Sequence, residues 1–310
     1  MLPCLDIVIV NWNSGVHLRE CVDSVIKYKH TLVNNVFVID NGSTDGSENL
    51  IMDLPNVSLI RVGENLGFGK ACNLGAKHSK NPYLLFLNPD AALYSETLPK
   101  ALTYMQDPAN INVGICGVQL LNESGCISKS SSRFPSVMGF TCHALGCDRL
   151  FPRLGHLMRE WDHAHTCEVD QVIGAFFMVR RCLFEAVEGF DERFFVYFEE
   201  VDFSYRAKQL GWSSVYLADA QAFHAGGGTS NQIKARRLFY SLRSRLLYAS
   251  KHFTLFGAIL VMFVTLLVEP LSRSVISLFR RSLAGFYETW VGYGMLCRWL
   301  LQCLFKGLAR

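Results

Sequence analysis

The first ninety residues contain four short apolar runs separated by polar or helix-like segments. The runs are rich in β-branched and aromatic residues, as strands buried on both faces are, and they occupy Leu5–Val10, Val36–Ile39, Val57–Val62 and Tyr83–Leu87. Strands joined by helix-length connections pair in parallel, with right-handed crossovers. We therefore predict an α/β fold in which a mostly parallel, Rossmann-like sheet is flanked by helices.

The connections between these strands predict three helices. Apolar residues recur at helical spacing over Leu18–Ile26. Ser43 or Asp45 can cap a second helix that carries Leu50. A third helix is predicted over Lys70–Ser79.

Polar residues gather after each of the four strands. They form the clusters Asn11–Ser14, Asp40–Asp45, Asn65 and Asn88–Asp90. In open α/β sheets, ligands bind beyond the carboxyl ends of the strands. The placement of these clusters predicts a ligand site at one edge of the sheet.

The turn after the first strand, Asn11–Gly15, lacks the GxGxxG pattern, which weighs against NAD-dependent dehydrogenases and related methyltransferases. The chain also lacks GxxxxGK[ST], which excludes a P-loop. A phosphate ligand then needs another partner, and a metal held by carboxylate is the obvious one. Asn88-Pro89-Asp90 can place a carboxylate for Mg²⁺ or Mn²⁺ at a strand end. An ordinary proline turn is the alternative.

The stretch Phe194–Arg206 sets three acids directly after a run of aromatic residues. Acids are rarely buried without a partner or a task. One interpretation is a helix N-terminus, where acids are favoured and Asp202 can pair with Arg206 one turn later. The other is a catalytic pair formed by Glu199 and Glu200.

Three later segments also invite a functional interpretation. The long polar stretch Asn122–Gln171 is predicted to hold an acceptor-facing loop, and its histidines and cysteines match no standard zinc spacing. Gly174 interrupts an apolar run and allows a ligand or another backbone to approach closely. His224 precedes Gly226–Gly228, a predicted flexible loop, and is either a metal ligand or a structural histidine.

Charge divides the chain into an acidic body and a basic tail. From Lys234 onward there are twelve Lys/Arg and two acids, whereas the preceding residues carry eighteen basic and twenty-five acidic side chains. The basic residues of the tail alternate with Leu, Phe and Trp. This pattern favours a membrane surface as partner over nucleic acid.

Within this tail, Phe253–Val268 is a run of sixteen uncharged residues, shorter than the roughly twenty that a spanning helix needs. We expect a re-entrant or interfacial segment, and helices packed on the catalytic domain are the alternative. Eleven scattered cysteines without a CxxC indicate reduced thiols and a cytosolic compartment. The first residues show no pattern of a signal peptide.

Taken together and in order, the motifs resemble the family-2 inverting glycosyltransferases of the GT-A fold. The nearest branch is similar to the bacterial rhamnosyltransferase-like enzymes of surface-polysaccharide assembly. The resemblance covers about residues 1–230 through the motifs IVIVNWNS (7–14), VIDNGSTDGS (38–47), ENLGFGKACNLG (64–75), LFLNPDA (85–91), GAFFMVRR (174–181), GFDERFFVYFEEVDFSYRAKQLGW (189–212) and FHAGGGTS (223–230).

The resemblance implies a role for particular residues. Asp40 would accept a hydrogen bond from the pyrimidine N3–H, Asp90 and His224 would bind the metal, Glu200 would be the general base, and Glu199 would orient the acceptor or the base. Asn88 and Glu200 stand where many family members have Asp, and both are departures. The residues implied to contact the nucleotide-sugar are Asn11, Asn13, Asp40, Asn65, Lys70, Asn88 and Asp90.

The activity implied is a metal-dependent, inverting transfer of a sugar from a dTDP- or UDP-sugar to a glycan or polyprenyl-diphosphate-linked acceptor. The branch suggests dTDP-rhamnose as the donor. We expect a catalytic domain over 1–230 and a helical membrane-association region over 231–310, at the cytoplasmic face of the inner membrane. Formation of a homo-oligomer is left as an open possibility. One alternative is a catalytically impaired relative that binds nucleotide-sugar or scaffolds an assembly complex. Another is a nucleotidyltransferase, but such an enzyme would need a glycine-rich, basic first loop.

Overall fold

The structure is a computed structural model that describes residues 4–29, 31–149, 151–156, 158, 160–226 and 234–305. The chain forms two compact units that interleave along the sequence. The first takes in the described residues of Met1–Phe134, Trp161–Phe195 and Glu199–Thr229, and the second those of Pro135–Glu160, Val196–Phe198 and Ser230–Arg310. A single functional boundary at residue 230 stays a prediction.

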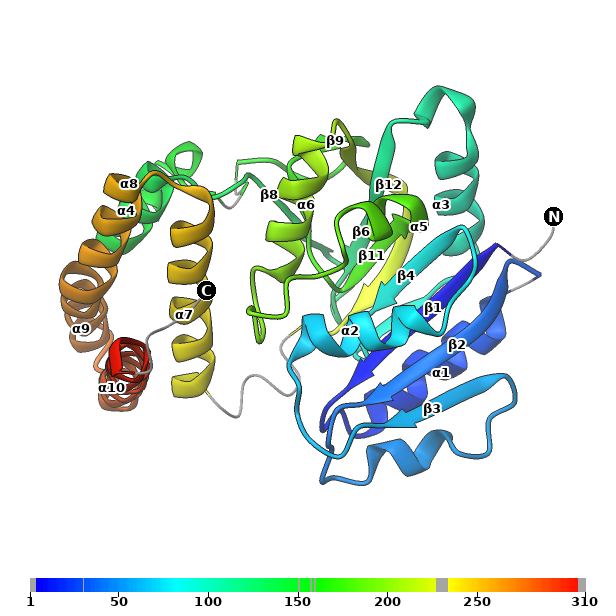
Figure 1. Ribbon diagram of the computed structural model, residues 1–310, viewed down its shortest axis with the longest axis horizontal. Helices are drawn as coiled ribbons and strands as arrows, with labels where there is room; N and C mark the ends of the chain where they lie inside the picture. Colours follow the sequence, from blue (N-terminus) through cyan, green and yellow to red (C-terminus); the bar gives the residue numbers. More distant parts are fainter. Residues whose placement is uncertain are drawn as a thin grey trace. The chain divides into compact units, whose positions relative to one another are not determined.

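The first unit is built on one large sheet (Figure 1). Its strands follow the order β3-β2-β1-β4-β11-β6-β12-β5, with β7 beside β6 and β9 beside β12. The strands are β1 Leu5–Asn11, β2 Val33–Asp40, β3 Val57–Arg61, β4 Tyr83–Leu87, β5 Ala91–Leu93, β6 Val113–Leu121, β7 Ile127–Ser128, β9 Cys167–Val169, β11 Phe176–Arg180 and β12 Ser213–His224. A separate two-stranded sheet pairs β8 (Ser131–Ser132) with β10 (Gln171–Val172).

The predicted α/β architecture with a central sheet and flanking helices is confirmed. Strands β1 to β4 are parallel, as their alternation with helices requires. The structure adds β11, which runs antiparallel to both β4 and β6 and makes the sheet mixed.

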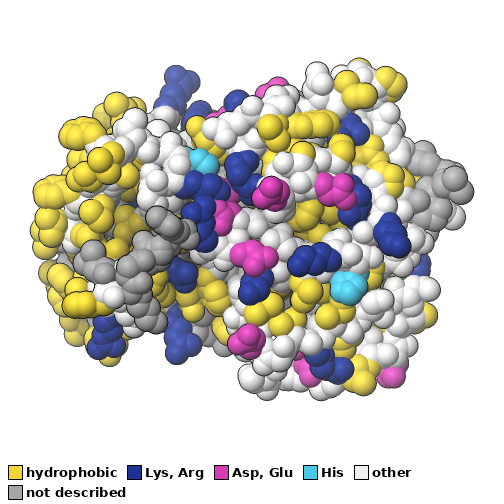
Figure 2. All heavy atoms as spheres, in the orientation of Figure 1, with side chains coloured by type: hydrophobic (Ala, Val, Ile, Leu, Met, Phe, Trp, Pro, Cys, Tyr) yellow, Lys and Arg dark blue, Asp and Glu magenta, His cyan; other side chains and the backbone are white. Residues whose placement is uncertain are grey.

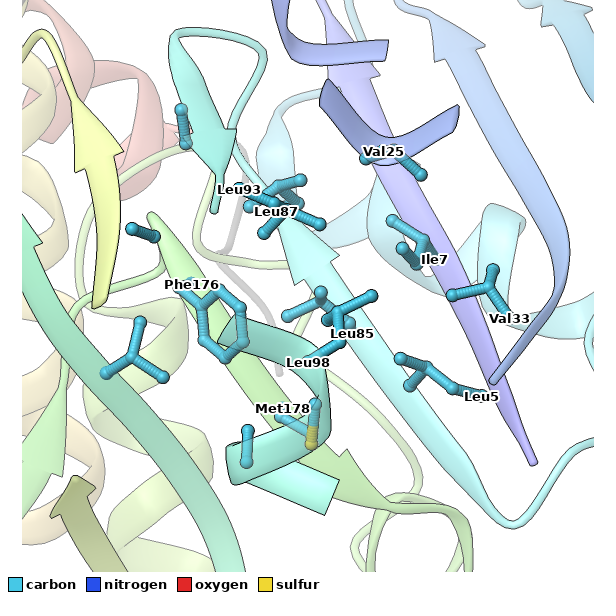
Figure 3. Packing of buried hydrophobic residues seen from close by; sticks show 14 of the residues in the cluster. Leu5, Ile7, Val25, Val33, Leu85, Leu87, Leu93, Leu98, Phe176 and Met178 are labelled. Atoms are coloured by element: carbon cyan, nitrogen blue, oxygen red, sulfur yellow. The ribbon is translucent and has the colours of Figure 1, made fainter. Parts of the chain in front are cut away.

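Helices cover both faces of this sheet because successive side chains of each buried strand point to opposite faces. One face packs against α1 (Val16–Tyr28) and α3 (Thr97–Gln106), and Figure 3 shows part of this core. The other face packs against α2 (Phe68–Lys77), α5 (Arg181–Ala186) and α6 (Glu199–Gln209).

One local prediction was wrong. The helix expected through Leu50 is a single 3₁₀ turn, η1 (Ser47–Ile51), and Asp45 does not cap it but accepts hydrogen bonds from the Ser47 N–H and hydroxyl. The long polar stretch Asn122–Gln171 contains the helix α4 (Val137–Leu145), and its acceptor-facing loop stays a prediction. The other 3₁₀ turns among the described residues are η2 (Pro108–Asn110), η3 (Cys147–Arg149) and η4 (Pro152–Leu154).

The second unit is helical. Besides α4 it contains α7 (Lys234–His252), α8 (Leu255–Phe263), the π-helix η6 (Val264–Val268), α9 (Glu269–Phe279) and α10 (Leu283–Phe305). Among the described residues, one continuous helix, Leu255–Phe279, is long and apolar enough to cross a membrane. Figure 2 shows hydrophobic side chains gathered over the α8 and α9 helices of this unit.

Candidate active site

Asn11 and Asp40 meet at the carboxyl edge of the sheet. The register of β1 and β2 pairs the two residues, and Asn11 Nδ2 donates to Asp40 Oδ1 at 2.9 Å. The same amide nitrogen reaches the hydroxyls of Ser43 and Ser47. Asn11 Oδ1 is buried without a hydrogen-bond partner in the part of the chain that the structure describes. This network holds the Asp40 carboxylate in place. The carboxylate oxygens still have lone pairs that can accept a hydrogen bond from a further donor.

The loops after β1 and β2 are tied together by side chains. Asn13, whose φ of 52° lies in the left-handed region that Asn tolerates, accepts from the Thr44 N–H at 2.8 Å. Asp45 accepts from the Gly15 N–H at 2.9 Å. Burial would raise the pKa of Asp45, but hydrogen bonds from Ser47 and Gly15 outweigh it and lower the pKa. The predicted residues Asn11, Asn13 and Asp40 are thus brought together.

Asn41 is a buried polar residue that the sequence patterns did not single out. Its Nδ2 donates to Asn65 Oδ1 at 3.0 Å and its Oδ1 accepts from the Leu66 N–H at 2.9 Å. Asn65 Oδ1 also accepts from the Gly67 N–H at 2.9 Å. Asn65 therefore shapes the turn that leads into α2. An amide side chain directly after a buried strand-end aspartate was the available signal for Asn41.

The start of α2 approaches the segment that precedes the acidic pair. The Phe68 N–H donates to the Phe195 carbonyl at 2.7 Å. A Cβ on Gly67 (φ 87°) would lie 2.3 Å from that carbonyl oxygen, so only glycine fits. A Cβ on Gly69 would lie 3.4 Å from Glu199 Cβ, which sets α2 against the start of α6. Lys70, a predicted nucleotide-binding residue, is exposed on α2.

Glu199 and Glu200 are the first two residues of α6. Glu199 is buried and Glu200 is partly buried, and one carboxyl oxygen of each has no hydrogen-bond partner among the described residues. Burial raises the pKa of Glu200 to about 7. Burial, and then the charge of Glu200, hold the pKa of Glu199 well above its usual range. Glu200 is therefore able to exchange a proton near neutral pH.

Asp202, two residues further along, has a different environment. It is fully buried and its Oδ2 accepts from Arg206 Nε at 2.8 Å. The guanidinium also donates to the carbonyl oxygens of Val187 and Gly189. The predicted Asp202–Arg206 pair is confirmed, and it fastens α6 to the preceding turn.

Two consecutive residues before the acidic pair have a left-handed backbone. Tyr197 and Phe198 show φ angles of 68° and 71°, which aromatic residues rarely adopt. Such conformations persist only where the surroundings hold them, and they concentrate at functional sites. Within the second unit, the ring of Phe198 contacts Tyr248 and Phe140. The backbone before Glu199 is therefore held in place.

Asp90 and His224 are joined by the pairing of β5 with β12. His224 lies opposite Ala91 in the ladder, and His224 Nε2 lies 3.3 Å from Asp90 Oδ1. Burial would raise the pKa of Asp90, but the hydrogen bond and charge of His224 outweigh it and lower the pKa. Asn88 stands two residues before Asp90, and its N–H donates to the Ala175 carbonyl at 3.1 Å.

The Asp90 carboxylate and the His224 imidazole are both suitable ligands for a divalent cation, and they lie close together at this strand end. The described residues contain no group of three or more His, Cys, Asp or Glu side chains that could hold a metal. Two protein ligands still suit a cation that is completed by substrate phosphate and water. The glycines predicted to form a flexible loop, from Gly227 on, lie outside the described residues.

Comparisons with known proteins agree on one family. The family described as Glycosyl transferase family 2 matches residues 6–142. The N-acetylglucosaminyl-diphospho-decaprenol L-rhamnosyltransferase of Mycobacterium tuberculosis is 30% identical over 275 residues, which cover 81% of this chain and 86% of that protein. The low-salt glycan biosynthesis hexosyltransferase Agl10 of Haloferax volcanii is 27% identical over 67% of this chain and 63% of its own length.

Solved structures show the same fold. The mannosyltransferase PcManGT from Pyrobaculum calidifontis, in complex with GDP-Man and Mn²⁺, superposes with a TM-score of 0.57 over 99% of this chain and 88% of its own, at 17% identity. GalNAc-T7 with UDP, GalNAc and Mn²⁺ gives 0.54 over 81% of this chain and 51% of its own, at 15% identity. At such identities the likeness concerns the fold alone.

Proposed function

This chain belongs to glycosyltransferase family 2, and from that premise we propose that it transfers rhamnose from dTDP-rhamnose to a hydroxyl of a lipid-linked glycan in surface-polysaccharide synthesis. The glycosyltransferase activity follows from the family, whereas donor and acceptor are proposed from the mycobacterial relative and from the motifs. The observation that carries the mechanism is the pair of carboxyl groups at the start of α6, each with one oxygen that has no hydrogen-bond partner among the described residues.

We assign the role of general base to Glu200. The acceptor hydroxyl oxygen attacks the anomeric carbon and forms the new glycosidic bond, while the bond from that carbon to the diphosphate oxygen breaks. The hydroxyl proton passes to the Glu200 carboxylate, and attack from the face opposite the leaving group inverts the anomeric centre. A pKa of about 7 lets this carboxyl accept a proton efficiently at neutral pH. Glu199 orients the acceptor or Glu200.

Asp90 and His224 would hold a divalent cation, Mg²⁺ or Mn²⁺, at the end of β4 and β12. When bound, such an ion neutralises the negative charge that develops on the leaving nucleoside diphosphate. Asn88 adds an amide oxygen from the same turn. Turnover that is unchanged in EDTA would contradict the assignment of these ligands.

The strand-end network is the proposed site of the nucleotide. Asp40 accepts the N3–H of a thymine or uracil ring, a role that its fixed carboxylate suits. Asn11 Oδ1, buried without a partner among the described residues, offers a second polar atom. Asn13 and Asn65 hold the surrounding loops, so they act by positioning them.

We also propose that the second unit lies on the cytoplasmic face of the membrane without crossing it. Exposed apolar side chains recur every four residues along Leu255–Phe279, at Leu255, Ile259, Phe263, Leu267, Leu271, Val275 and Phe279. Steps of four overshoot the 3.6-residue turn of an α-helix, and the wider π turn of η6 offsets part of this drift. The stripe suits a helix that lies in the interface plane.

A buried ion cluster on the same helix argues against spanning. Glu269 is 1% exposed and contacts Arg245 of α7 and Arg273 of α9. Crossing the bilayer would require α9 to leave α7, which would separate Glu269 from Arg245 in an apolar medium. The exposed apolar stripe can contact lipid while this cluster stays intact.

The test of the transfer reaction uses the purified full chain, dTDP-rhamnose and a lipid-linked N-acetylglucosamine acceptor, with release of dTDP as the readout. We expect Glu200→Gln to lose transfer, Glu200→Asp to retain part of it, and the exposed control Glu188→Gln to match the native enzyme. A Glu200→Gln enzyme with the native rate would remove Glu200 as the base. Binding of dTDP-rhamnose by a native chain that transfers no sugar would favour the impaired relative.

A further inference from the structure

The second unit contains a cavity of about 300 Å³ that lies between α7, α9 and α10. Three cationic side chains line it, from Lys234, Arg273 and Arg280, together with one acid, Glu288. Three hydroxyl-bearing residues, Ser277, Ser282 and Thr289, complete its polar wall. A wall with three cations, one acid and three hydroxyl-bearing residues is suited to a phosphate group.

The start of α10 adds a favourable field at this cavity. Ser282 caps the helix, since its Oγ accepts from the Gly285 N–H at 3.1 Å. The helix then runs 23 residues, so its positive end lies at the cavity wall. Gly285 keeps the space open, because a Cβ there would lie 3.0 Å from Ser282 Oγ and 3.4 Å from Ser277 Oγ.

Arg273 keeps net positive charge at the cavity although it is paired. Its partner Glu269 is shared with Arg245, so two guanidinium groups face one carboxylate. Burial would raise the pKa of Glu269, but the charges of Arg245 and Arg273 outweigh it and lower the pKa. The cluster therefore retains one positive charge.

The surroundings of the cavity indicate where its phosphate comes from. The turn between α9 and α10 exposes large apolar side chains on both sides of Arg280, with Phe279 85% exposed and Leu283 78% exposed. Tyr287, one turn into α10, is 70% exposed. A soluble phosphate needs no apolar surface beside its site, whereas a phospholipid brings acyl chains next to its phosphate.

We propose that this cavity binds the headgroup phosphate of an anionic glycerophospholipid. The inference rests on the proposed membrane association of the same unit and extends it from general attraction to a defined site. Lys234 at the start of α7 and Arg280 after α9 contact the phosphate, while Phe279 and Leu283 enter the acyl region.

The test measures binding of the full chain to vesicles of phosphatidylcholine, with and without phosphatidylglycerol. We expect the native chain to bind the anionic vesicles more tightly. In Lys234→Gln/Arg280→Gln this gain should fall by about tenfold or more, because the cavity loses two of the three cations that would contact the phosphate. The control Arg236→Gln/Arg298→Gln removes equal charge from exposed positions on α7 and α10 and should keep most of the gain.

A second variant tests the shape of the cavity without changing charge. Gly285→Ala puts a methyl group against Ser282 and Ser277 while favouring helix formation, so we expect a smaller gain on anionic vesicles from a folded chain. If the cavity variants and the control variant lose the gain on anionic vesicles equally, the attraction to the charged membrane is diffuse and the proposal is overturned. A response to polyprenyl phosphate in phosphatidylcholine, with none to phosphatidylglycerol, would also overturn it.

Failure of membrane association itself gives a different result. Phe256→Ser/Phe263→Ser removes two exposed apolar side chains from α8, Phe263 on the stripe and Phe256 beside it, and should weaken binding to both vesicle types. If that variant binds both vesicle types as tightly as the native chain, the proposed association of the second unit with the membrane is contradicted. Loss in that variant, combined with an unchanged gain in the cavity variants, would contradict the phosphate site alone.

Discussion

Buried acids occur in both units of this protein, but in opposite settings. In the second unit, Glu269 is held by Arg245 and Arg273, and its pKa is lowered. In the first unit, Glu199 and Glu200 have oxygens without partners among the described residues, and their pKa values are raised. The first arrangement holds helices together, whereas the second retains the desolvation penalty that a partner would have offset.

The same contrast recurs within the single helix α6. Asp202 is paired with Arg206, and the two acids at the helix start are not. Unpaired buried carboxyls destabilise a fold, so their presence needs a functional reason. This difference separates the acids that maintain structure from those that we propose act on substrate.

The largest expected effect is on catalysis. Glu200→Gln should lower kcat by about 10²–10⁴-fold, the usual contribution of a general base. The melting temperature should not fall, because the substitution removes a poorly solvated ionisable group. Steady-state release of dTDP and thermal unfolding of the same preparation check both parts. A large loss of stability would place Glu200 with the structural acids and break the contrast.

Glu269→Gln should show the reverse. It leaves two guanidinium groups facing a neutral amide, and breaking a buried pair in this way costs about 3–5 kcal/mol, less here because Arg273 is partly exposed. Urea unfolding of the full chain measures the loss, with Glu288→Gln as a control that removes one acid from the same unit. An unchanged unfolding free energy would show that the ion cluster is not what secures α9 to α7.

Much of the fold could be predicted because burial on both faces leaves a strong pattern. The strand Tyr83–Leu87 matches its predicted bounds, since it is an apolar run bounded by turn residues. The 3₁₀ turn at Ser47–Ile51 and the antiparallel direction of β11 could not be read, because both depend on tertiary packing and not on local periodicity.

The candidate site was predictable where its residues lie next to strands. Asn11 and Asp40 each end a buried strand, and parallel pairing alone brings them together. Asp90 and His224 are far apart in the chain and meet through the β5–β12 ladder, so only the family resemblance linked them. Nothing local showed that Phe198 belongs with the second unit, because its partners Phe140 and Tyr248 are distant in sequence.

A smaller effect is expected in the pH dependence of the rate. A base must be ionised to accept a proton, and the pKa of Glu200 is raised to about 7. We therefore expect kcat/KM to rise with pH, about tenfold per unit below 7, and to level off above it. A Glu200→Asp enzyme should keep a rising limb, with its midpoint set by the new carboxyl. A native profile that is flat from pH 5 to 8 would remove the unpaired carboxyl from the rate-limiting step.

The smallest effect is on stability and has the opposite sign. A carboxyl whose pKa is about 7 when folded and 4.5 when unfolded binds more protons in the folded state between these values. The free energy of unfolding should therefore fall as pH rises from about 4.5 to 7. Glu269, with a lowered pKa, loses its contribution only as pH falls below that window. Melting temperatures across the window should decline by a few degrees for the native chain and less for Glu200→Gln, while Glu188→Gln should follow the native curve. Equal declines in all three proteins would mean that other groups carry the pH dependence, and the raised pKa of Glu200 would then lack thermodynamic support.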